Sequence, residues 1–99
     1  MTHETITEEV RQKAIKDAIV AREQECFGYE FNITNYRLLL EDLPAGEMPE
    51  HLKTPQSEEE AKEAALYHFR QDVASRLLAE EIEMDKSRRV LAVLKKRLK

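Results

Sequence analysis

The sequence has few residues that interrupt a helix. It contains two glycines, three prolines, one cysteine and no tryptophan. All three prolines and one of the glycines fall between residues 44 and 56, so the rest of the chain can form long uninterrupted helices. Charged residues make up 36% of the chain, which is typical of helical and coiled-coil proteins. We therefore expect an all-α fold.

The single cysteine and the lack of long apolar runs indicate the cellular compartment in which we expect the protein. Cys26 has no second cysteine with which to form an internal disulfide, and a lone cysteine in a helical pattern is usually a small buried apolar residue. No run approaches the roughly 20 apolar residues of a membrane span. The start of the chain lacks the basic and apolar regions of a secretory signal. We expect a cytoplasmic protein with no membrane span.

The residue patterns that support catalysis are also missing. The sequence has no HExxH or Glu-x-x-His pair, no glycine-rich phosphate loop and no GxSxG turn. His68 and Asp72 are one helical turn apart, but two ligands are too few for a specific zinc site. The sequence predicts no catalytic residue, no metal and no cofactor, and we expect that the protein is not an enzyme.

Two helices are predicted before the proline-rich stretch. Apolar residues recur at helical spacing over residues 6–26, and Gly28 follows where a C-terminal cap would lie. A second helix is predicted over residues 33–42, because Tyr29, Ile33, Tyr36, Leu40 and Leu43 follow alternating intervals of four and three. Residues 27–34 also alternate apolar and polar positions, which leaves open a strand that pairs with another chain.

A connector over residues 43–56 and a long helix over residues 57–99 complete the predicted fold. Ser57 and Glu60 form a capping-box pattern, in which the Glu60 carboxylate is expected to accept from the Ser57 N–H. Residues 85–87 are weak helix formers, so a break is possible there. The sequence thus predicts one domain of residues 1–99, a small bundle of three or four helices.

The long helix is predicted to be the site of binding, because the rest of the chain is too short to cover it. Leu77, Met84, Leu91 and Leu98 are spaced by sevens, as in a coiled-coil seam, with Leu94 between the last two. We expect a homodimer or a protein partner. The residues predicted to bind the partner are Arg88, Arg89, Leu91, Leu94, Lys95, Lys96, Arg97 and Leu98.

The charge distribution leaves two further functions open. Residues 86–99 carry seven cations and no acid, so they could bind nucleic acid, although no aromatic residue among them could stack on a base. The acidic clusters at residues 8–9, 58–60 and 80–85 could instead fill a basic groove. In composition alone, the chain resembles phage-encoded inhibitors of host enzymes. The sequence therefore predicts a non-catalytic interaction or regulatory protein, with an inhibitor or a nucleic-acid-binding accessory protein as alternatives.

Overall fold

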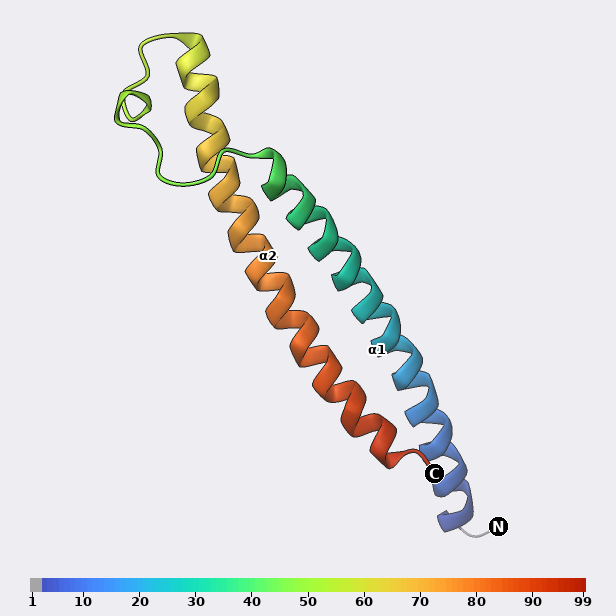
Figure 1. Ribbon diagram of the computed structural model, residues 1–99. Helices are drawn as coiled ribbons and strands as arrows, with labels where there is room; N and C mark the ends of the chain where they lie inside the picture. Colours follow the sequence, from blue (N-terminus) through green and yellow to red (C-terminus); the bar gives the residue numbers. More distant parts are fainter. Residues whose placement is uncertain (1–2) are drawn as a thin grey trace. The chain divides into compact units, whose positions relative to one another are not determined.

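Two long helices make up most of the protein. The computed structural model describes residues 3–99, and the side-chain surroundings from Thr7 onward. Helix α1 spans His3–Asp42, the short 3-10 helix η1 spans Glu50–Leu52, and helix α2 spans Glu58–Arg97 (Figure 1). Residues 3–99 contain no strand. The prediction of an all-α fold is confirmed, and two long helices stand where three or four were expected.

Helix α1 runs without interruption through the expected break. The helices predicted over residues 6–26 and 33–42 are parts of one helix of 40 residues, so the predicted boundaries are wrong. The alternative left open, a strand over residues 27–34, does not form, because these residues are helical. Gly28 is helical, and only Gly46 has a positive φ, of 87°, among the described residues. A glycine inside a helix costs about 1 kcal/mol. Burial of the regularly spaced side chains on both sides of Gly28 outweighs that cost.

Helix α2 begins at the predicted cap and is also continuous. The Glu60 N–H donates to the Ser57 hydroxyl at 3.0 Å, as the capping box requires. The Glu60 carboxylate, however, accepts from the Gln56 N–H at 3.2 Å and not from the Ser57 N–H. The possible break at residues 85–87 does not occur, and Ser87, with only 2% of its surface exposed, is part of the core.

The residues of both long helices group into two compact units. Unit 1 contains α1 as far as Phe31 together with the chain from Glu81 onward. In this unit the two helices lie side by side and antiparallel, because Lys99 contacts Gln12 while Ser87 contacts Glu25 (Figure 1). The α1 residues that face α2 are spaced by fours and threes, as in a coiled coil, and they include the buried Ile15, Ile19 and Cys26.

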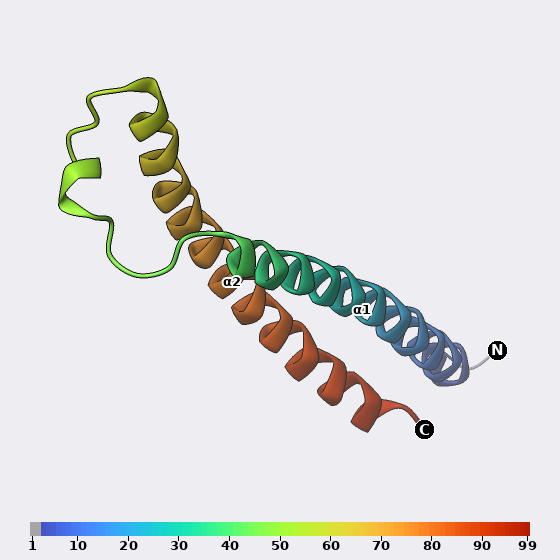
Figure 2. The same cartoon turned by 45° about the horizontal axis from the view of Figure 1, so that its top comes forward.

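Unit 2 spans residues 32–80 and contains the connector. Its buried apolar side chains are Ile33, Leu52, Ala64 and Val73. The connector forms an open loop that carries η1 (Figure 2), and Leu52 of η1 is only 2% exposed. Burial of this leucine fixes the connector within unit 2, since one fully buried leucine contributes roughly 2 kcal/mol.

The cap of α2 leads to a stability prediction. Replacing Ser57→Ala removes the acceptor for the Glu60 N–H and is expected to lower the free energy of unfolding by about 1 kcal/mol. Ser75→Ala is the matched control, because Ser75 is exposed inside the same helix and alanine there has the higher helix propensity. Urea unfolding followed by circular dichroism measures both variants. Equal stabilities for the two would contradict the assigned cap.

Candidate interaction surface

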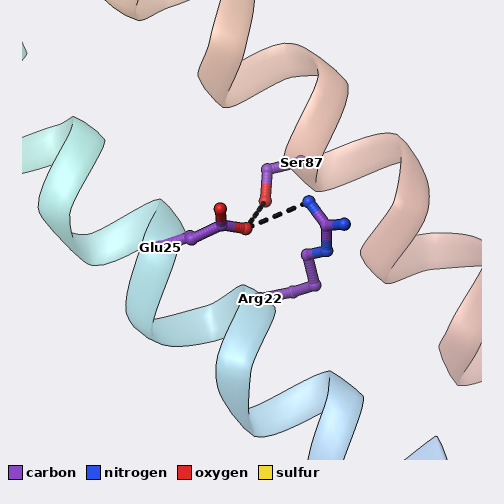
Figure 3. A network of polar contacts seen from close by, with 3 residues as sticks. All are labelled: Arg22, Glu25 and Ser87. Atoms are coloured by element: carbon purple, nitrogen blue, oxygen red, sulfur yellow. Dashed lines mark hydrogen bonds and ion pairs between the residues drawn. The ribbon is translucent and has the colours of Figure 1, made fainter.

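A small polar network joins α1 to α2 in the middle of unit 1. The Ser87 hydroxyl donates to Glu25 Oε2 at 3.2 Å, and Arg22 Nη1 lies 3.0 Å from the same oxygen (Figure 3). Ser87 is buried, with only 2% of its surface exposed. A buried hydroxyl needs a hydrogen-bond partner, so Glu25 fixes which residues of the two helices face each other. The network is therefore structural.

The cations of residues 86–99 are largely occupied within the chain. Arg88 Nη2 lies 2.9 Å from Glu30 Oε1 of α1, and Lys99 Nζ lies 3.0 Å from Glu8 Oε1. The other two pairs are Lys86 with Glu83 at 3.1 Å and Arg89 with Asp85 at 2.8 Å. Four of the seven cations in this segment thus have an acidic partner, which reduces the positive potential that they present to solvent.

The predicted partner-binding residues fall into two groups by position. Leu91 and Leu94 are half-buried, and Leu94 lines a cavity of about 230 Å³ in unit 1 together with Ile15, Ala18 and Arg97. The remaining predicted residues of α2 and the chain end are exposed: Arg88, Arg89, Lys95, Lys96, Arg97 and Leu98. Leu94 therefore already lies against α1 of the same chain, whereas Leu98 and the charged members are exposed.

The ion pair between Lys99 and Glu8 in unit 1 changes the pKa of Glu8. The Lys99 ammonium donates a hydrogen bond to the Glu8 carboxylate, and its charge adds to the attraction. Both effects lower the pKa of Glu8 below its ordinary value. Because both groups are solvent-exposed, the pair affects the protonation of Glu8 more than the stability of the fold.

The largest exposed apolar side chains of unit 1 lie on α1. Phe27 is 71% exposed and Phe31 is 62% exposed, and these two phenylalanines are one helical turn apart. Val20 precedes Phe27 by two turns and is 54% exposed. Since buried Cys26 and Ile19 point toward α2, the three exposed residues lie on a different side of α1. We call this side, defined by Val20, Phe27 and Phe31, the outer face of α1.

The outer face follows a second regular pattern along α1 within unit 1. Val20, Gln24, Phe27 and Phe31 are spaced by four, three and four, and all four are exposed. This spacing is that of a coiled-coil seam, separate from the one that faces α2. This stripe was not predicted from the sequence, because Phe27 and Phe31 were assigned to the break between two helices. The signal was present, since these phenylalanines fall outside the series that contains Tyr29 and Ile33.

Three further features of the described residues concern metal binding, a cavity in unit 2 and membrane spanning. Among residues whose side chains the structure describes, no three His, Cys, Asp or Glu side chains are placed to bind a metal ion. In unit 2, a cavity of about 470 Å³ lies between η1 and α2 and is lined partly by Leu52, Leu66 and Tyr67. Neither long helix, over its described residues, has the length of apolar sequence needed to cross a membrane.

Comparisons with models of protein families, with curated proteins and with solved structures gave no match.

The position of Leu94 predicts a difference in stability between neighbouring substitutions. Leu94→Ala removes apolar contacts with α1 and is expected to lower the free energy of unfolding by about 1 to 2 kcal/mol. Val93→Ala is the control, because Val93 is exposed and surface substitutions usually change stability by less than about 0.5 kcal/mol. Chemical denaturation of both variants provides the test. A larger loss for the Val93 variant would show that α2 turns a different side toward α1.

The Glu8 ion pair predicts a change in titration. Lys99→Met removes the hydrogen bond and the charge, so the pKa of Glu8 should rise toward its ordinary value. In the unmodified chain, the ion pair between Glu8 and Lys99 is fully formed above the ordinary pKa of a glutamate. The pair is lost as the pH falls through the lowered pKa of Glu8, because the carboxylate is then protonated. NMR titration of the Glu8 carboxyl carbon measures this shift, with Lys96→Met as control. An unchanged Glu8 pKa in the Lys99 variant would rule out the pair.

Proposed function

We propose that this chain is a non-catalytic interaction protein whose outer face of α1 binds another protein. The observation that supports the proposal is the exposure of Phe27 and Phe31. Exposed large apolar side chains scattered singly are ordinary, but two phenylalanines and a valine in one stripe are typical of a binding surface. A phenylalanine also supplies large contact area, which makes aromatic residues frequent at the centres of protein interfaces.

The binding free energy that the outer face can contribute can be estimated from the apolar surface that a partner would bury. Covering the exposed parts of Val20, Phe27 and Phe31 would contribute about 4 kcal/mol. A micromolar complex needs about 8 kcal/mol of net binding free energy. The outer face therefore supplies a substantial part of the affinity, and further contacts on both sides of the stripe supply the remainder.

A protein partner is favoured over nucleic acid by the charges near the stripe. Glu23 is an exposed acid one turn before Phe27, and it would repel phosphates. The basic residues 86–99, which are the alternative nucleic-acid site, use four of their seven cations in ion pairs within the chain. The roles predicted for Arg88, Leu91 and their neighbours, and an inhibitory activity, remain predictions, because no described contact favours them over the outer face.

Site-specific photo-crosslinking tests the proposal. A photoreactive phenylalanine analogue at position 27 or 31 is expected to yield a discrete adduct of higher mass in cells, because the partner lies against these side chains. The same analogue at Lys62, which is exposed on α2 in unit 2, is the control and should yield no such adduct. Adducts are detected by mass after denaturing electrophoresis. No discrete adduct from either phenylalanine position would overturn the proposed function.

A further inference from the structure

We propose that a cavity in unit 2 binds a small organic cation, an amine joined to an apolar body. The cavity has a volume of about 470 Å³ and lies in unit 2, whereas the outer face of α1 lies in unit 1. This binding site is therefore independent of the proposed function. The size of the cavity, its apolar wall and two carboxylates without a basic partner support this class of ligand.

The cavity is formed by the connector and by the helix ends that the connector joins. Its lining residues fall between Asp42 and Tyr67, and they come from the end of α1, the connector, η1 and the first part of α2. All of them belong to unit 2. Small-molecule sites in proteins have volumes of roughly 300 to 1,000 Å³, so this cavity is large enough for an organic ligand.

Most of the cavity wall is apolar. The apolar residues that line it are Leu43, Pro44, Pro49, Leu52 and Leu66. Leu52 is 2% exposed and holds η1 in place, whereas Leu66 is 46% exposed. Water therefore reaches a large apolar side chain at the cavity, and the hydrophobic effect favours a ligand that covers this leucine. The ligand is thus expected to have an apolar body.

The acidic residues of the lining have no basic residue beside them in the cavity. Asp42 and Glu63 line the cavity, and no lysine or arginine does. Neither carboxylate takes part in an ion pair among the described residues. Lys53, which follows η1, is itself paired with Glu50 at 2.9 Å. The cavity therefore presents negative charge that the chain does not neutralise, and a cation complements it.

The end of α1 adds to this negative charge. Asp42 is the last residue of α1, and the last turn of the helix contains no basic residue. A helix has a partial negative charge at its C-terminus, where the last carbonyl groups lack partners within the helix. Glu41 and Asp42 are therefore unfavourably placed for the helix itself. A cation bound beside Asp42 would offset both the carboxylate charge and the helix dipole.

An amine fits this lining better than a metal ion does. The residues whose side chains the structure describes include no group of three His, Cys, Asp or Glu placed to bind a metal ion. A bare ion would also leave the apolar wall uncovered. Tyr67 lines the cavity, and an aromatic ring is a favourable neighbour for an organic cation. The lining thus matches both parts of an amine that carries an apolar body.

Probes that share a phenethyl group separate the effect of charge from that of shape. Phenethylamine is positive, phenethyl alcohol is neutral and hydrocinnamate is negative. The amine should bind on the order of 10-fold more tightly than the alcohol, because two surface ion contacts and one helix end each contribute a factor of about 2 or 3. Hydrocinnamate should bind more weakly than the alcohol. Methylamine, which has the charge without the apolar body, should not saturate the site.

Amide NMR of the isotopically labelled chain measures these affinities and locates the site. Phenethylamine is expected to shift the amide signals of Leu43 and Leu52, which line the cavity, in the millimolar range typical of so small a ligand. His51 is the one lining residue among the described side chains that can become positive without being a lysine or arginine. The titrations are therefore made at about pH 8, where an ordinary imidazole is uncharged.

Neutral variants test the two carboxylates. Asp42→Asn and Glu63→Gln preserve the size of each side chain and remove its charge, so each should weaken phenethylamine binding roughly 2- to 5-fold and leave phenethyl alcohol unaffected. In the double variant the two affinities should differ by no more than a factor of about 3. Asp72→Asn is the matched control, because Asp72 is exposed on α2 and does not line the cavity. It should leave both affinities unchanged.

The results that would overturn this site differ from those that bear on the outer face. Equal affinities of the unmodified chain for the amine and the alcohol would overturn the proposed cation site, as would a preference for the amine that the double variant retains in full. No amide shifts at tens of millimolar phenethylamine would overturn it as well. The crosslinking at positions 27 and 31 probes unit 1, so its failure would overturn the proposed function alone.

Discussion

The structure depends on the fact that one helix can cover only one side of another. In unit 1, α1 turns Ile15, Ile19 and Cys26 toward α2, and the buried Ser87 fixes the alignment through Glu25. A helix has apolar neighbours only along the stripe in contact, so the rest of the α1 surface must be polar or find another cover. It carries Phe27 and Phe31. We propose a partner because these apolar side chains lie where α2 does not cover them.

Charge reinforces the pairing of the two helices within unit 1. Acids occur along α1 and cations are concentrated in residues 86–99, and the antiparallel arrangement brings Glu8 to Lys99 and Glu30 to Arg88. Both pairs lie inside unit 1. Exposed pairs of this kind contribute little stability individually. Their main effects are to specify the alignment and to leave fewer cations for an outside partner.

Much of the fold was predictable, and the reasons for the failures are physical. The all-α class followed from composition, and the connector and the start of α2 followed from the prolines and from Ser57. The predicted helix break at Gly28 was wrong. The free-energy cost of one glycine in a helix is small compared with the stabilisation from burying a long row of apolar side chains. The outer face was missed for the same reason: Phe27 and Phe31 join one stripe only when the helix is continuous. Spacing alone does not tell which α1 side chains are covered by α2, because the covered stripe and the exposed stripe are both spaced by fours and threes.

Fluorine NMR of the chain labelled with fluorophenylalanine is the most direct test of whether the outer face is covered in solution. The sequence has three phenylalanines, and in the single chain Phe27 and Phe31 are 71% and 62% exposed while Phe69 is 41% exposed. The solvent isotope shift between H₂O and D₂O reports how much water each ring meets. We predict that the order is reversed, with Phe69 showing the largest shift because a partner shields the other two. Shifts that follow the exposure of the single chain would contradict the account.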